Sequence, residues 1–166
     1  MNQYRHLLSF VGLSVGGFAA VVGVSATVAV ALPGREVAGN HQIVAQAGSP
    51  LPSQLQGKPV VVEIHADWCS KCQAIAPTLS ALRRQYQGKA HFVAFDVTNR
   101  TTTQAATARA RELGLVNFLA ANRSRPSAVA IIDPRTGRVL RQFFNNPRQQ
   151  DYTAVLNGAI AQLQRR

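Results

Sequence analysis

Cysteine is scarce in this chain of 166 residues, which holds only two, Cys69 and Cys72. Two cysteines are too few for a scaffold held together by disulfides. A bridge between them would close a very small loop, and such a loop adds little stability in the chain-entropy model. The pair therefore indicates a chemical role rather than a structural one.

Acidic residues are also few, seven against 18 lysines and arginines, so the formal net charge is +11. The basic residues are scattered along the sequence, whereas nucleic-acid binding favours a basic stripe with interleaved aromatic residues. We therefore predict no nucleic-acid partner. The simpler interpretation is a solvated basic surface that attracts anionic partners or an anionic membrane face.

Charged residues are absent from residues 7–32, which read LLSFVGLSVGGFAAVVGVSATVAVAL. This run exceeds the roughly 20 residues that a helix needs to span a bilayer. We predict that residues 1–32 are a transmembrane anchor, with the N-terminus in the cytoplasm because of Arg5. The small residues Ala29-Val30-Ala31 are typical of a cleavage site, so a cleaved signal segment stays open as the alternative. In both cases the rest of the chain lies across the membrane.

Residues 33–58 are rich in Gly, Pro, Ser and Gln and show little periodicity, which is typical of a linker. The folded domain is predicted at residues 59–166. In that domain, short β-branched runs indicate strands and apolar residues at helical spacing indicate helices. The predicted strands are 60–65, 90–97, 127–132 and 138–144, the predicted helices are 70–86, 103–113 and 151–164, and residues 115–125 are predicted to be irregular.

This order of elements, β-α-β-α-β-β-α, predicts an α/β fold with a mixed four-stranded sheet. The first three strands alternate with helices, which predicts parallel strands joined by right-handed crossovers. The tight turn at residues 133–137 predicts an antiparallel hairpin for the last two strands.

The two cysteines form a CxxC motif at a strand-to-helix junction, a position typical of redox motifs. A helix that begins at Cys69 places free N–H groups and the positive end of its dipole near that sulfur, which favours a thiolate. Lys71 adds a cation, and Cys72, one turn further along the helix, is expected to be more buried. We therefore predict that Cys69 attacks a partner disulfide and that Cys72 resolves the mixed disulfide, leaving a Cys69–Cys72 disulfide.

Glu63 lies in the otherwise apolar strand just before the motif. Strand alternation places it on the opposite face from Val62 and Ile64. A buried carboxylate at this position could exchange a proton with Cys72 during the resolving step. An exposed or salt-bridged glutamate on the strand surface stays open as the alternative.

The sequence Trp68-Cys69-x-x-Cys72, the following residues 73–77 and the acid six residues before Cys69 together resemble the thioredoxin superfamily over residues 59–164. The order of elements is that of the thioredoxin core. This resemblance implies a cis peptide bond before Pro126, opposite the cysteines, with neighbouring backbone that pairs with a bound substrate. An ordinary trans proline in a loop stays open as the alternative. Trp68 and Arg125 are expected to border the same groove, as further substrate-binding residues.

Residues 61–69 are more narrowly similar to membrane-anchored thioredoxin-like proteins of thylakoid and bacterial membranes. That similarity implies a domain on the periplasmic or thylakoid-lumen side which reduces disulfides of exported proteins, including apocytochromes. It also implies a transmembrane thiol carrier as electron donor, and no cofactor. The sequence departs from the general family in Ser70-Lys71 between the cysteines and in Ala94, which stands where thioredoxins often have a lysine.

Three other functions stay open. The same residues could serve a disulfide oxidase or isomerase, because the direction of electron flow depends on the reduction potential. A metal-binding module could use the cysteines with His65 and His91, but a closed zinc site needs four ligands and no second CxxC is present, so we predict no metal. A non-catalytic adaptor with the same fold would have no need of an intact CxxC.

Overall fold

The structure is a computed structural model in which residues 48–165 are described. The predicted anchor or signal segment, residues 1–32, and most of the predicted linker lie outside these residues. Within residues 48–165, no helix is both long enough and apolar enough to cross a membrane.

Four strands form one mixed sheet in the order β2-β1-β3-β4. The predicted number of strands and the predicted mixture of parallel and antiparallel pairing are confirmed. Strand β1 pairs in parallel with β2, and β3 pairs antiparallel with both β1 and β4. The central strands are rich in β-branched and aliphatic residues, which suit a sheet that is covered on both faces. The strands are β1 (Val60–His65), β2 (His91–Asp96), β3 (Ala128–Asp133) and β4 (Arg138–Phe144).

The predicted parallel orientation of the third strand is wrong, because β3 runs antiparallel to β1. Two helices separate β2 from β3: α2 (Arg100–Glu112) and α3 (Val116–Asn122), the second of which lies in the segment predicted to be irregular. Gly114, with φ of 66°, provides the left-handed residue between them. The first helix leads away from the carboxyl end of β2 and the second leads back, so that Ser127 N–H donates to the Ile64 carbonyl at 2.9 Å.

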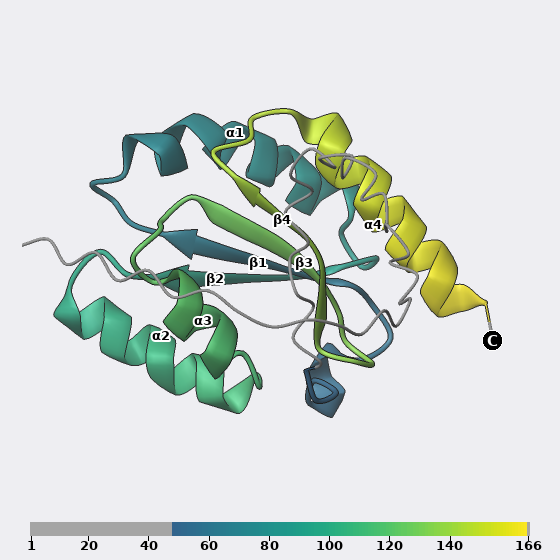
Figure 1. Cartoon of the computed structure of the whole chain (residues 1–166). Helices are drawn as coiled ribbons and strands as arrows, with labels where there is room; N and C mark the ends of the chain where they lie inside the picture. The colour runs from purple at the N-terminus through teal and green to yellow at the C-terminus, as the bar shows by residue number, and fades with distance from the viewer. Residues whose placement is uncertain (1–47, 166) are drawn as a thin grey trace, which may run out of the picture. The chain divides into compact units, whose positions relative to one another are not determined.

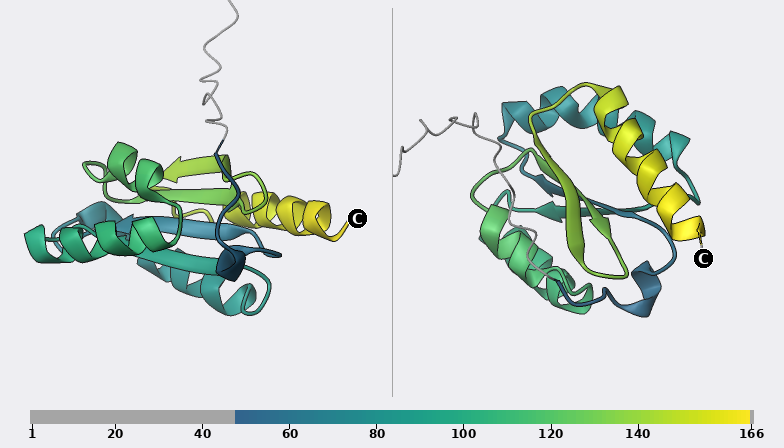
Figure 2. Two further views of the ribbon diagram at one scale, coloured as in Figure 1. Left: turned by 90° about the horizontal axis from the view of Figure 1, so that it is seen from below. Right: turned by 45° about the vertical axis from the view of Figure 1, so that its right-hand side comes forward.

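Helices cover both faces of the sheet (Figures 1 and 2). The helices α1 (Ser70–Gln85) and α4 (Gln149–Gln164) lie on one face, and α2 and α3 lie on the other. Alternate residues of the strands therefore enter two separate cores. One core holds Val61, Ile75, Leu79, Leu82, Ile131, Tyr152 and Leu156, and the other holds Val62, Ile64, Phe95, Ala110, Leu119 and Ile132.

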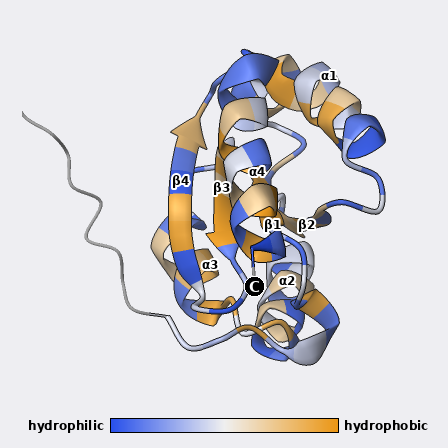
Figure 3. Ribbon diagram, turned by 90° about the vertical axis from the view of Figure 1, so that its right-hand side faces the viewer, coloured by the Kyte–Doolittle hydropathy of each residue, from blue (hydrophilic) through white to orange (hydrophobic). Residues whose placement is uncertain are grey.

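Strands β3 and β4 differ in how deeply they are buried. Every residue of β3 is buried, whereas β4 is exposed or half-buried along its length. Figure 3 shows the same contrast, with continuous hydrophobic colour on β3 and alternating colour on β4. The strand β4 is therefore an edge strand whose outer residues face solvent.

The segment before Pro59, which the sequence assigns to a linker, takes part in the described fold. A short 3₁₀ helix, η1 (Ser53–Leu55), brings Leu51 and Leu55 into the core on the α2 side. The backbone N–H of Leu51 donates to the Pro134 carbonyl at 2.8 Å, and the Gln56 amide donates to the same oxygen at 2.8 Å. Leu51, just before the 3₁₀ helix, and Leu55, at its end, are both buried, which explains why this stretch packs against the domain.

Candidate active site

Cys69 is the N-cap residue of α1, at the carboxyl end of β1. The backbone is extended there, with φ of −89° and ψ of 103°, and the Cys72 N–H donates to the Cys69 sulfur at 3.1 Å. A side-chain acceptor at the N-cap normally receives one of the N–H groups that the first helical turn leaves without a backbone partner. The predicted helix start beside Cys69 is confirmed, and the acceptor in this helix is a sulfur atom.

The two cysteines are free thiols with different surroundings. The exposed fraction is 7% for Cys69 and 0% for Cys72, whose thiol faces the Ile64 carbonyl at 3.9 Å. Burial raises the pKa of the Cys72 thiol to about 11, and its hydrogen bond with Cys69 and the charges of Cys69 and Glu63 add to the rise. Cys72 is therefore protonated at neutral pH and needs a proton acceptor before it can attack.

Glu63 is buried on the α1 side of β1, where the sequence places it. Its carboxylate accepts a hydrogen bond from the Arg83 guanidinium at 3.0 Å. Glu63 is therefore salt-bridged, as the alternative expected, but it is buried and not on the strand surface. Ala94 lies opposite Glu63 in the β1–β2 register, which means that the cation comes from α1 and not from the neighbouring strand. No hydrogen bond joins Glu63 to Cys72 in residues 48–165, so direct proton exchange between them stays a prediction.

His65 connects Glu63 to the surface. Its Nδ1 lies 3.6 Å from Glu63 Oε1, and its Nε2 lies 3.2 Å from Asp67 Oδ1. The imidazole is partly exposed and stands between two carboxylates on the same side of β1. The described residues contain no group of three or more His, Cys, Asp or Glu residues arranged to hold a metal ion.

An open groove beside Cys69 brings together residues that are distant in the sequence. It unites the predicted residues Trp68, Cys69, Arg125 and Pro126, while Glu63 and Cys72 lie outside its lining. The full lining is Trp68, Cys69, Ser70, Lys71, Ser124, Arg125, Pro126, Ser127, Phe144 and Asn145.

Phe144 is a groove residue that the sequence analysis missed. It ends β4 and pairs with Ala128 at the start of β3, two residues after Pro126. The predicted hairpin could have indicated this position, because an antiparallel hairpin places the end of its second strand, β4, beside the start of its first strand, β3.

The peptide bond before Pro126 is trans, which corrects the cis bond that the family resemblance implies. No peptide bond in residues 48–165 is cis. Ala128 N–H donates to the Arg125 carbonyl at 3.3 Å, and Ser127 between them has φ of 74°. These features are those of a type II turn with proline at its second position and a positive φ at its third. The chain reversal before β3 is thus made by Ser127.

Thr98, which the sequence analysis also missed, fixes the loop that precedes Cys69. Its hydroxyl accepts the Asp67 N–H at 3.0 Å, and its carbonyl accepts the Trp68 indole N–H at 2.9 Å. Thr98 is held in turn by Asp96, whose pKa is lowered by hydrogen bonds from the Thr98 side chain and backbone. Parallel strands end at the same edge of a sheet, so a residue just after β2 could have been placed beside one just after β1.

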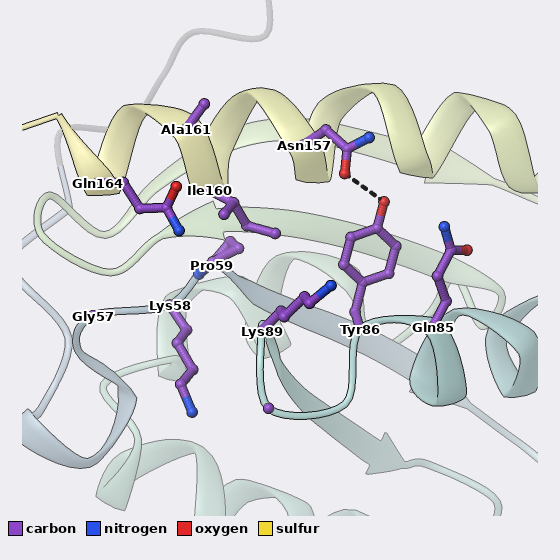
Figure 4. Close-up of a pocket in the computed structure, with 11 residues that line it drawn as sticks. Gly57, Lys58, Pro59, Gln85, Tyr86, Lys89, Asn157, Ile160, Ala161 and Gln164 are labelled. Carbon is purple, nitrogen blue, oxygen red and sulfur yellow. Dashed lines mark hydrogen bonds between the residues drawn. The ribbon is translucent and has the colours of Figure 1, made fainter.

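A second hollow lies at the opposite end of α1 and β1 (Figure 4). It is bordered by residues 57–59, the turn after α1 and the last turns of α4, and it contains no cysteine. Its aromatic residue, Tyr86, donates a hydrogen bond from its hydroxyl to Asn157 Oδ1 at 2.8 Å.

Comparisons with known proteins find similarity to thioredoxin-like proteins. Residues 45–121 match the thioredoxin family model. The thiol:disulfide interchange protein TxlA homolog of Synechocystis sp. is 34% identical over 99 residues, which cover 59% of this chain and 54% of that protein. The chain thus spans about half the length of that relative. The chloroplastic thioredoxin-like protein HCF164 of Arabidopsis thaliana is 46% identical over 43 residues, which cover 26% of this chain and 16% of that protein.

Among solved structures, a thiol:disulfide interchange protein of the thioredoxin family from Chlorobium tepidum covers 69% of this chain and 96% of its own, with 16% identity and a TM-score of 0.48.

Proposed function

We propose that this chain, of which residues 45–121 match the thioredoxin family model, is a thiol:disulfide oxidoreductase that reduces protein disulfides through the Cys69/Cys72 dithiol. The observation that carries this proposal is the asymmetry of the two sulfurs. Cys69 lines an open groove and receives the Cys72 N–H, whereas Cys72 has no exposed surface. One sulfur can meet a partner, and the other can meet only the first.

In the first step, the Cys69 thiolate attacks one sulfur of a partner disulfide. A bond forms between the two sulfurs, and the partner's other sulfur leaves as a thiolate that takes a proton from solvent. The N–H of Cys72 donates to the Cys69 sulfur, and the positive end of α1 lies at the same residue.

In the second step, Cys72 loses its proton and attacks the Cys69 sulfur. A proton acceptor is needed because the pKa of the Cys72 thiol is about 11. We assign this role to Glu63, whose carboxylate lies 3.0 Å from the Arg83 guanidinium. The Cys69–Cys72 bond forms as the bond to the partner breaks. The partner's second sulfur leaves as a thiolate and takes up a proton, which balances the one that Cys72 released. In total, the partner gains two electrons from the dithiol and two protons, one from solvent and one in exchange for that of Cys72, and it leaves with two thiols.

The oxidised chain must then receive two electrons from a dithiol donor. We propose that this donor is a transmembrane thiol carrier and that residues 7–32 anchor the chain with the domain on the periplasmic or thylakoid-lumen side. The uncharged apolar run supports the anchor, and one relative is named as a chloroplastic protein, which is compatible with the thylakoid alternative. The substrates on that side would be exported proteins, including apocytochromes awaiting haem.

The reduction potential of the Cys69/Cys72 couple, together with insulin reduction by dithiothreitol, tests the activity. A potential near that of thioredoxin, roughly −270 mV, with rapid insulin reduction supports the reductase. A potential near roughly −120 mV would favour an oxidase instead. An inactive chain that takes up stoichiometric metal would contradict both.

The location is tested on the full chain expressed in a bacterial host. After permeabilisation of the outer membrane, a maleimide that does not cross the inner membrane should label Cys69, and the chain should stay in the membrane fraction at its full mass. A soluble periplasmic chain that has lost about 31 residues would instead support the cleaved signal segment. Labelling only after cell lysis would contradict both arrangements.

A further inference from the structure

We propose that the groove beside Cys69 selects protein disulfides that are flanked by acidic and apolar residues. This inference rests on the proposed function and adds a substrate class to it. It is carried by the placement of two cations and two exposed aromatic rings around the groove that contains Cys69.

The charged side chains that line the groove are both cations. Lys71 lies between the cysteines, and Arg125 lies just before Pro126. Both side chains are exposed, and neither forms an ion pair with an acidic group of residues 48–165. Asp67 is the acidic residue nearest to Lys71 in the sequence, and its Oδ1 lies 3.2 Å from His65 Nε2. A carboxylate on a bound substrate protein would therefore meet two cations that form no ion pair with an acidic residue of the described domain.

The Arg125 side chain stacks on Phe144, at the end of β4. The guanidinium carbon lies 4.1 Å from the centre of the Phe144 ring, which is a cation–π contact. A guanidinium that stacks on a ring keeps its N–H edges free, and these edges match the geometry of a carboxylate. The groove thus presents a hydrogen-bond donor for an acidic side chain. This donor is local to the groove, unlike the net positive charge of the whole chain.

Two aromatic rings add apolar surface beside these cations. Trp68 is 65% exposed although its indole N–H is bonded to Thr98, and Phe144 is 43% exposed. They come from the loop before α1 and from the end of β4. Exposed large apolar side chains that cluster at a groove favour apolar residues of a partner. The preferred peptide therefore combines an acidic residue with an apolar one near its cysteine.

The charge preference can be measured with two peptide disulfides that differ only in whether glutamate or lysine flanks the cysteine. For each peptide, kcat/KM is measured with the full chain and divided by the value for the uncharged 2-hydroxyethyl disulfide. Exposed ion pairs contribute modestly, so we expect the glutamate peptide to be preferred by about fivefold at low salt. The preference should fall towards one in roughly 1 M salt, where screening extends over only about 3 Å.

Arg125→Gln should reduce this preference by about half or more, and Lys71→Gln should reduce it further once the neutral disulfide corrects for any change in thiol reactivity. Arg109→Gln is the matched control, because Arg109 is an exposed cation on α2 that does not line the groove, and it should leave the preference unchanged.

Equal rates for the two peptides, or a preference for lysine, would overturn the inference and leave the oxidoreductase intact. A preference that Arg109→Gln lowers as much as Arg125→Gln would also overturn it, because the effect would then belong to net charge. Failure to reduce either peptide or the neutral disulfide would overturn the proposed function itself.

Discussion

The two hollows at opposite ends of α1 and β1 look alike in charge and differ in chemistry. Each is bordered by two cations and contains an aromatic side chain. At the first, the sulfur of Cys69 is placed for reaction and Trp68 is largely exposed. At the second, Tyr86 is only 3% exposed and its hydroxyl is already bonded to Asn157.

The direction of α1 explains this difference. The helix begins at Cys69, where its free N–H groups and positive dipole end lie beside the sulfur. It ends next to Tyr86, where carbonyl groups and Arg83 and Arg84 gather instead. The same helix therefore presents N–H donors to a sulfur atom at one end and a buried, hydrogen-bonded tyrosine at the other. The first hollow is a candidate site because it contains a cysteine sulfur, whereas the second contains no such reactive group.

Replacement of Cys69 should separate the two hollows most strongly. We expect Cys69→Ser to lower insulin reduction by at least about a thousandfold, because the attacking thiolate is lost. Lys89→Gln, at the second hollow, should change the rate by less than about twofold. Both rates are measured at equal concentrations of folded protein, checked by circular dichroism. A comparable loss from Lys89→Gln would remove the distinction between the hollows.

Arg83 belongs to the last turn of α1 but neutralises Glu63 in the middle of β1. Arg83→Gln leaves a buried carboxylate without its cation, so we expect the free energy of unfolding to fall by about 2 kcal/mol, less than for a fully buried pair because Arg83 is half exposed. Urea unfolding gives the value. Adding Glu63→Gln should restore most of the loss, and an additive loss in the double variant would show that the two residues do not interact.

Tyr86→Phe removes the hydroxyl that closes the second hollow. We expect the free energy of unfolding to fall by about 1 kcal/mol, because Asn157 loses its partner. The rate of insulin reduction should stay the same. A change in that rate without a matching change in stability would indicate that the second hollow takes part in the chemistry.

The raised pKa of Cys72 makes a smaller and pH-dependent contribution to stability. The unfolded thiol ionises near pH 9.0 and the folded thiol near pH 11, so the contribution is complete below pH 9 and is lost as the pH rises to 11. Urea unfolding of the dithiol form at pH 8 and pH 10.5 should show a fall that is smaller in Cys72→Ala. An identical fall in the variant would assign it to other groups, such as Tyr152, whose pKa burial raises to about 12.

The sequence could predict what depends on local pattern. The strand before Cys69 and the helix after it follow from short-range periodicity. Helix α2, however, begins at Arg100, three residues earlier than predicted, because Asn99 and Thr102 cap it reciprocally. Helix α3 was missed because its N-cap, Leu115, offers no side-chain acceptor and so leaves no start signal.

Long-range features escaped prediction for a different reason. The antiparallel direction of β3 depends on that unpredicted helix, and the contact of Arg83 with Glu63 joins residues 20 positions apart. Arg83 does follow Leu79 by four residues, which places it at the edge of the buried face of α1. Its partner could be identified only once the packing of α1 on β1 was known.

Covalent trapping of a disulfide-containing protein tests the roles of the two cysteines most directly. The full chain with Cys72→Ala and the full chain with Cys69→Ala are each incubated with the same protein, and mass spectrometry locates any mixed disulfide. We expect Cys72→Ala to accumulate a mixed disulfide through Cys69, because nothing remains to resolve it, and Cys69→Ala to form none. A mixed disulfide through Cys72, or equal trapping by both variants, would contradict the assignment of Cys69 as the attacking thiol.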